Sequence, residues 1–110
     1  MDFEIRKDLT SNWFKTLQES ICQSISELEN NKIKFKSTTW KKNQKKDEGG
    51  GEYRILKDGR IFDKVGVNFS KVYGKFPKNF QKQIPGAEKN PNFWASGISV
   101  VMHMKNPLIP

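Results

Sequence analysis

The chain has 110 residues and a net charge of +8, from 20 Lys and Arg against 12 Asp and Glu, so we expect residues 1–110 to form a single small basic domain with a modest core. The hydrophobic fraction of 35% and the charged fraction of 29% indicate a soluble, folded protein and argue against a disordered one. No apolar run approaches the roughly 18 residues of a membrane span, and the charged N-terminus lacks the apolar core of a signal peptide, so we expect a cytoplasmic protein with no membrane partner.

The first predicted element is a helix from Leu9 to Leu28. Its apolar residues recur at spacings of four and three, which places them in a stripe along one helix face. The stripe consists of Leu9, Trp13, Leu17, Ile21, Ile25 and Leu28. Candidate N-caps are Asp8, Thr10 and Ser11. Asn30 and Asn31 are expected to stop the helix. Cys22, the single cysteine, lies beside the stripe and is interpreted as a small core residue in a reducing compartment.

After this helix the apolar period changes from about 3.6 to 2, which is typical of strands. The segment "KIKFKSTTW" predicts a strand with one solvated face, and "KKNQKKDEGGGE" predicts a charged, glycine-rich loop. Asp58-Gly59 lies between two runs of strand-forming residues and predicts a hairpin. In the second arm of that hairpin Val65, Val67 and Phe69 share one face.

The last third of the chain predicts a loop followed by a closing strand. The segment "KFPKNFQKQIPGAEKNPN" contains three prolines and is expected to be mostly loop. Residues Phe93 to His103 read as a strand. One helix followed by about four strands predicts an α+β fold with an antiparallel β-sheet.

Ser99 and His103, the only histidine, are the candidate functional residues of this strand. They are four residues apart, so they lie on one face and about 13 Å apart at a rise of roughly 3.3 Å per residue. That separation excludes a Ser–His nucleophilic pair, which needs hydrogen-bond contact. It suits two contacts on one large, flat ligand. A single histidine is weak support for a metal site, because such a site needs about three or four donors.

The positive charge is concentrated in two stretches. Seven lysines and no acid lie between Lys32 and Lys46, and five lysines and no acid lie between Lys64 and Lys82. Such fields favour a polyanion, either nucleic acid or a ligand with several carboxylates or phosphates. A basic module that binds single-stranded nucleic acid is one hypothesis, which the 12% aromatic content permits. The aromatic residues fall mainly on apolar faces, however, and no RNA-binding signature is present, so nucleic acid is the less favoured partner.

Several longer segments carry a family resemblance: "ESICQSISELE", "EGGGEYRIL", "GRIFDKVGVNFSKVYG" and "FWASGISVVMHMKNPLIP". In this order, and over nearly the whole chain, they resemble aerobic (oxygen-dependent) coproporphyrinogen III oxidase. The resemblance implies an antiparallel β-sheet of seven strands flanked by helices, and a homodimer. It implies the oxidative decarboxylation of two propionates of coproporphyrinogen III to vinyl groups in heme biosynthesis, with molecular oxygen as co-substrate and protoporphyrinogen IX as product.

The same resemblance implies roles for two residues. It makes Ser99 a substrate-binding residue and His103 a ligand of a divalent metal, as described for bacterial members. The four carboxylates of the substrate give the lysine-rich stretches a partner. The family's motif continues past a final proline into a T-x-H-x-N-x-R segment that carries the proton-donor histidine, whereas this sequence stops at Pro110. We therefore expect the N-terminal portion of such an enzyme, with no catalytic residue within the chain and no activity on its own.

Local departures from the family pattern surround the glycine run. A lysine-rich insertion from Lys41 to Asp47 separates Trp40 from Glu48, where the family is shorter. Three glycines stand where four are usual, and Tyr53 replaces a common serine. These differences affect the expected geometry of the glycine loop and leave the resemblance intact.

Overall fold

The computed structural model describes residues 2–110 and consists of one long helix beneath a four-stranded antiparallel sheet. The helices are α1 (Phe3–Leu28) and the short α2 (Lys78–Gln81), and the strands are β1 (Lys36–Lys41), β2 (Gly49–Lys57), β3 (Phe62–Lys75) and β4 (Asn92–Met104). The strand order is β1-β2-β3-β4, so each strand pairs with its neighbour in the sequence. The predicted α+β fold with an antiparallel sheet is confirmed.

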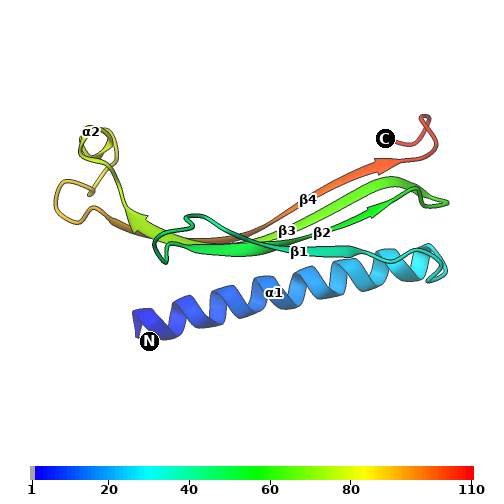
Figure 1. Ribbon diagram of the computed structural model, residues 1–110, viewed down its shortest axis with the longest axis horizontal. Helices are drawn as coiled ribbons and strands as arrows, with labels where there is room; N and C mark the ends of the chain where they lie inside the picture. The colour runs from blue at the N-terminus through cyan, green and yellow to red at the C-terminus, as the bar shows by residue number, and fades with distance from the viewer. Residues whose placement is uncertain (1) are drawn as a thin grey trace.

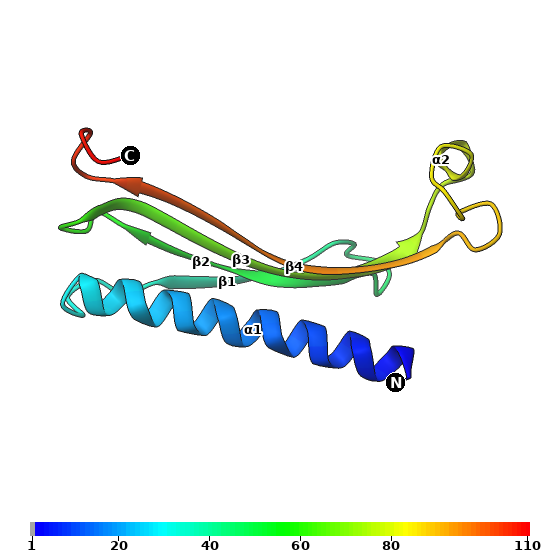
Figure 2. The same ribbon diagram turned by 180° about the vertical axis from the view of Figure 1, so that it is seen from behind.

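The two faces of the sheet differ because α1 covers only one of them (Figures 1 and 2). The sheet bends so that the end carrying α2 and the end carrying the C-terminus both rise away from the helix. The face opposite α1 is therefore concave and uncovered by any other element between residues 2 and 110. Within that part of the chain, no helix is both long enough and apolar enough to span a bilayer.

Helix α1 begins six residues earlier than the sequence predicts and ends where predicted. Its N-cap is Asp2, whose Oδ1 accepts a hydrogen bond of 3.1 Å from the backbone N–H of Glu4. The expected cap Ser11 is instead buried within the helix, where its hydroxyl donates to the Lys7 carbonyl. Asn30 and Asn31 adopt left-handed backbone conformations, with φ of 57° and 54°, and terminate the helix.

The helix face that meets the sheet is only partly the predicted apolar stripe. Ile25 is buried and Ile21 packs against the core, but Leu9 and Trp13 are 56% and 61% exposed. The reason is that a polar residue, Gln18, lies at the centre of the contact between α1 and the sheet. Gln18 is 1% exposed, and its Nε2 donates to the Glu52 and Val67 carbonyls at 2.9 and 3.1 Å. The buried face of α1 thus follows Ser11, Gln18, Cys22 and Ile25, to one side of the predicted apolar stripe, and the Gln18 hydrogen bonds satisfy the polar group at its centre.

The hydrophobic core lies between the C-terminal half of α1 and the hairpin of β2 and β3. Val65, Val67 and Phe69 lie on the face toward α1, as their alternation predicted. The buried core cluster consists of Cys22, Ile25, Leu56, Phe62, Val65 and Val67. The position of Cys22 confirms its interpretation as a core residue, and burial raises the pKa of its thiol. The predicted hairpin at Asp58-Gly59 is also confirmed, with Gly59 donating to the Phe62 carbonyl.

The glycine run belongs to a strand, which corrects the expectation of a continuous loop from residue 41 to residue 52. Strand β2 begins at Gly49, and the connection from β1 ends just before it. A Cβ on Gly50 would overlap the Trp40 carbonyl, and one on Gly51 would overlap the Phe69 carbonyl. The glycines are therefore required for close pairing of β2 with its neighbours on both sides.

Candidate ligand-binding site

The uncovered sheet face carries both residues that the sequence singled out. Ser99 pairs with Asn68 on β3, and His103 pairs with Lys64. Both Ser99 and His103 line one hollow of about 280 Å³. The prediction that the hydroxyl and the imidazole share a face is confirmed by this arrangement, while the roles assigned to them stay predictions.

The floor of this hollow is apolar and flat between the two polar groups. Val101 lies midway between Ser99 and His103 on β4, and it pairs with Gly66 on β3, which in turn pairs with Ile55 on β2. No atom lies within 4 Å of a Cβ built on Gly66, so the space above this glycine is open. A broad, flat molecule can therefore rest on this row of residues while its edges reach the polar groups on either side.

Asn68 adds a further polar group. The alternation along its strand predicts that it shares a face with Ser70, which is compatible either with contact to a ligand or with an exposed sheet surface. The Oδ1 of Asn68 accepts a hydrogen bond of 3.1 Å from Nε1 of Trp40, across two strands. Among residues 2–110 the Nδ2 group of Asn68 makes no hydrogen bond, so it can donate to a ligand. The strand register decides between these alternatives in favour of the site, because it places Asn68 beside Ser99.

A second hollow continues the same face toward β1. Its volume is about 410 Å³, and it shares Tyr53 and Ile55 with the first hollow. Its cationic side chains are Lys34, Lys36 and Lys57. With Lys64, the two adjoining hollows present four lysines and contain no acidic lining residue. This combination of an apolar floor and a cationic rim suits a flat ligand with several negative charges.

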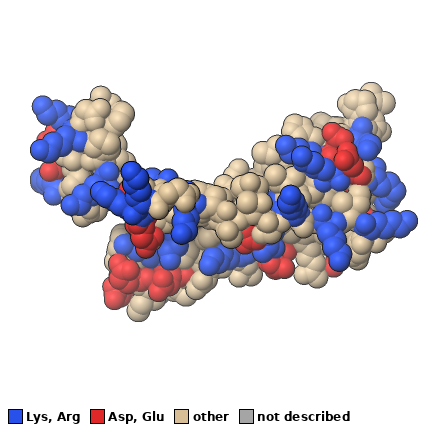
Figure 3. Space-filling view, viewed as in Figure 1, with Lys and Arg blue, Asp and Glu red and all other residues tan. Residues whose placement is uncertain are grey.

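The remaining lysines of the first charged stretch do not contribute to this face. Lys41, Lys45 and Lys46 instead line a separate hollow between the sheet and α1. In Figure 3, Lys and Arg side chains are distributed over both ends of the molecule. The lysine-rich stretch from residue 32 to residue 46 was predicted to form one region of positive charge. In the structure it is divided between the two faces of the sheet.

The residues present do not fit a divalent metal ion at His103. Within residues 2–110, no group of three or more His, Cys, Asp or Glu side chains could hold a metal. The residue paired with His103 is Lys64, whose ammonium group repels cations. The metal role that the resemblance implied for His103 gains no support from its surroundings in this chain.

Comparisons with known proteins agree with the sequence resemblance. A family model described as Coproporphyrinogen III oxidase matches residues 9–110. Similar curated proteins include the oxygen-dependent coproporphyrinogen-III oxidases of Rickettsia akari and Rickettsia typhi, each 42% identical over 112 residues, and that of Rickettsia bellii, 41% identical. Each alignment covers 94% of this chain and 39% of the relative, so the chain spans well under half the length of these proteins.

Proposed function

Because this chain belongs to the coproporphyrinogen III oxidase family, we propose that it forms part of an oxygen-dependent enzyme that converts coproporphyrinogen III to protoporphyrinogen IX in heme biosynthesis. Two propionate side chains of the substrate are oxidatively decarboxylated to vinyl groups, and molecular oxygen accepts the electrons. The function of this chain is to provide a substrate-binding face. The observation that carries the proposal is the concave sheet face, on which Ser99, His103 and four lysines surround an apolar floor.

The dimensions of the face support a macrocyclic ligand. Strands lie about 4.8 Å apart, so four strands present a surface about 14 Å across. Ser99 and His103 are separated by a comparable distance along β4. The porphyrinogen ring rests on Gly66 and Val101, and Ser99 and Asn68 supply hydrogen bonds at its edge.

The lysines account for the acidic groups of the substrate. Lysine binds anionic groups as a flexible point charge, which suits carboxylates carried on mobile propionate arms. Lys57, Lys64 and His103 lie side by side on β2, β3 and β4 at one end of the face, and Lys34 and Lys36 extend the positive charge toward β1. These charges can hold propionates on one side of the ring, while Ser99 and Asn68 lie on the other side of Gly66 and Val101. On this proposal His103 contributes a hydrogen bond or a proton at the ligand edge, and the complete enzyme is a cytoplasmic homodimer.

Binding of coproporphyrin III, the stable oxidised form of the substrate, tests the proposal. We expect the 110-residue chain to quench porphyrin fluorescence saturably. Loss of one hydrogen bond costs about 1 kcal/mol, which is a factor of about 5 in affinity, so Ser99→Ala and His103→Ala are each expected to weaken binding about fivefold. Gly66→Leu is expected to weaken it more, because the new side chain fills the hollow above the floor.

Control variants on the α1 side of the sheet distinguish binding at a specific site from nonspecific binding. Ser24→Ala on α1 and Met102→Ala on the other face of β4 are expected to leave affinity unchanged. The tetramethyl ester of coproporphyrin, which lacks the negative charges, is expected to bind more weakly. Equal affinity for the acid and the ester, or equal losses in the control variants, would contradict the proposal.

A further inference from the structure

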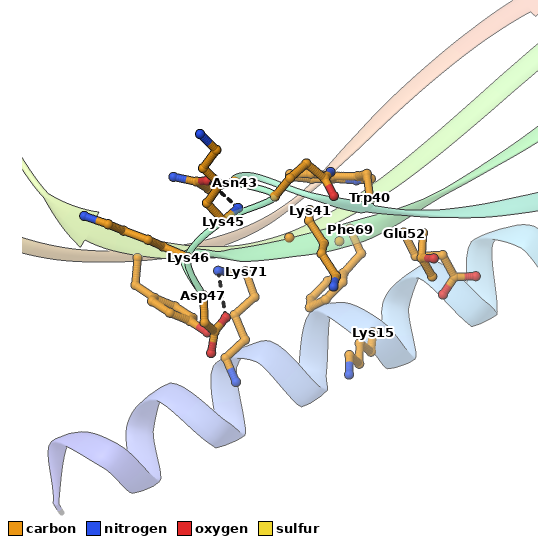
Figure 4. A pocket seen from close by; sticks show the side chains of 16 residues that line it. Lys15, Trp40, Lys41, Asn43, Lys45, Lys46, Asp47, Glu52, Phe69 and Lys71 are labelled. Carbon is orange, nitrogen blue, oxygen red and sulfur yellow. Dashed lines mark hydrogen bonds between the residues drawn. The ribbon is translucent and has the colours of Figure 1, made fainter.

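A hollow of about 660 Å³ lies on the α1 side of the sheet, away from Ser99 and His103 (Figure 4). It is bounded by α1, by the connection between β1 and β2, and by β3. We propose that this hollow binds a small ligand carrying several phosphate groups. The proposal does not depend on the porphyrinogen site, because the sheet separates the two hollows.

The hollow is lined by lysines from three separate segments. Lys15 comes from α1 and Lys71 from β3, while the end of β1 and the inserted connection supply Lys41, Lys45 and Lys46. In Figure 4 the side chains of Lys41 and Lys71 extend from the sheet toward α1, Lys15 lies on α1, and Lys46 extends away from the helix. Three segments far apart in the sequence thus place positive charge around one volume, which lies within the range typical of small-molecule sites.

None of these five lysines takes part in the ion pairs formed between residues 2 and 110. The two acidic residues of the hollow already have partners. Asp47 accepts hydrogen bonds from the Tyr73 hydroxyl and the Gly49 N–H, and Glu52 accepts one from Arg54 at 2.8 Å. The Tyr73 and Gly49 hydrogen bonds, together with Lys41 and Lys71 nearby, hold the pKa of Asp47 below its usual range, so this carboxylate remains ionised and accepts those bonds at neutral pH. Lys41 and Lys71 act on Asp47 and Lys15 acts on Glu52 through space, but five lysines against two carboxylates leave the lining with a net charge of +3, which an external anion can balance.

The number of cations indicates phosphate as the preferred anion. Five lysines line this one hollow. A phosphate group brings about −1.5 to −2 charges and three acceptor oxygens at neutral pH, whereas a carboxylate brings one charge and two oxygens. A short phosphate chain therefore concentrates more negative charge in this volume than a carboxylate ligand of similar size. Lys15 also lies 5.5 Å from the centroid of the Phe69 ring, an aromatic contact that positions its ammonium group at the hollow.

Isothermal titration of the full 110-residue chain with sodium tripolyphosphate tests this inference. We expect saturable binding of one ligand per chain, and at least a tenfold loss of affinity in the triple variant Lys15→Gln/Lys41→Gln/Lys71→Gln. The matched control is Lys32→Gln/Lys89→Gln/Lys105→Gln, which removes the same charge from exposed positions elsewhere. It is expected to weaken binding less than threefold. Far-ultraviolet circular dichroism establishes that both variants remain folded, and the single variant Lys41→Gln, at an exposed position, serves if the triple variant does not fold.

Two further measurements distinguish a phosphate site in this hollow from a general anion site and from the porphyrinogen site. Citrate, a tricarboxylate, is expected to bind at least tenfold more weakly than tripolyphosphate. Ser99→Ala and His103→Ala are expected to leave tripolyphosphate binding unchanged, whatever they do to porphyrin binding. The inference is overturned by equal losses in the two triple variants, by citrate binding as tightly as tripolyphosphate, or by the absence of saturable binding.

Discussion

Glu29 connects the end of α1 to the turn between β2 and β3. Its side chain is 2% exposed, and its carboxylate accepts backbone hydrogen bonds from Arg60, from Ile61 at 2.6 Å and from Phe62 at 3.0 Å. Burial by itself raises the pKa of Glu29, but the three backbone donors outweigh this effect and hold the pKa below its usual range. One side chain thus satisfies three donors that the turn would otherwise leave without partners.

This arrangement makes stability depend on pH. A carboxylate whose pKa is lower in the folded state stabilises the protein above its unfolded-state pKa, about 4.3 for glutamate, and the contribution is lost as the pH falls through the folded-state value. We expect Glu29→Gln to lower the free energy of unfolding by about 2 kcal/mol at pH 7. Urea unfolding at pH 7 and pH 3 measures this loss, which should shrink at the lower pH.

Glu27→Gln is the control for this measurement, since Glu27 is exposed on the same helix. It is expected to change stability by less than about 0.5 kcal/mol. A Glu29→Gln effect of the same size at both pH values would show that the charge of the carboxylate is not what stabilises the turn.

At the scale of single residues, local periodicity was sufficient to predict which side chains share a face of one strand. Ser99 and His103 share a face because strand residues alternate with a period of 2, and no tertiary information is needed. Asn68 and Gly66 matter because of what lies opposite them on the neighbouring strands. That register depends on the turns and on the glycines of β2, so it could not be deduced from the spacing of residues along one strand.

Strand β2 offers a test of whether its glycines are structural. A Cβ on Gly51 would overlap the Phe69 carbonyl and approach Cζ2 of Trp40 at 2.8 Å. We expect Gly51→Ala to destabilise the protein by about 1–3 kcal/mol, because one of these neighbours must move. Urea unfolding followed by circular dichroism measures the change. Gly66→Ala is the matched control within the same sheet: its Cβ meets no atom within 4 Å, so little destabilisation is expected. Similar losses in the two variants would argue against this role for Gly51.

At the scale of elements, the sequence predicted the helix, the hairpin and the closing strand, and it placed the end of α1 correctly. It did not predict which side of α1 faces the sheet. Apolar periodicity identifies a stripe, but the contact was decided by the amide of Gln18, which finds two carbonyls on the sheet. A buried polar residue that pairs with a distant backbone leaves no periodic signal in the sequence.

The whole molecule has an exposed edge and exposed apolar surface. Strand β4 is an edge of the sheet, and along it Val100, Val101 and Met102 are 39%, 53% and 46% exposed. Exposed apolar edges favour pairing with other chains. We therefore expect the 110-residue chain to associate at concentrations of tens of micromolar or above. Sedimentation velocity measures this association.

A lysine introduced on the β4 edge tests whether this edge causes the association. Val100→Lys lies on the face away from the candidate site and is expected to shift the population toward monomer, since lysine on an edge strand opposes pairing. Thr16→Lys, at an exposed position on α1, adds the same charge and is expected to have no such effect. A single sharp monomer peak for the unsubstituted chain, together with cooperative melting, would contradict the expectation.

The sequence anticipated the architecture of the whole molecule more fully than the distribution of its charge. The change of period after Leu28 predicted one helix followed by an antiparallel sheet, because that change is visible in the chain itself. The lysines from residue 32 to residue 46 looked like one continuous field. They separate because alternate residues of a strand point to opposite faces, and because the inserted connection lies on the α1 side.

The order of the strands has a consequence for biosynthesis. Between residues 2 and 110, hydrogen-bonded strands are always neighbours in the chain. Strands β2, β3 and β4 can therefore each pair with a strand that has already left the ribosome. This part of the sheet can grow one strand at a time, which shortens the period during which its unpaired segments are open to misassembly.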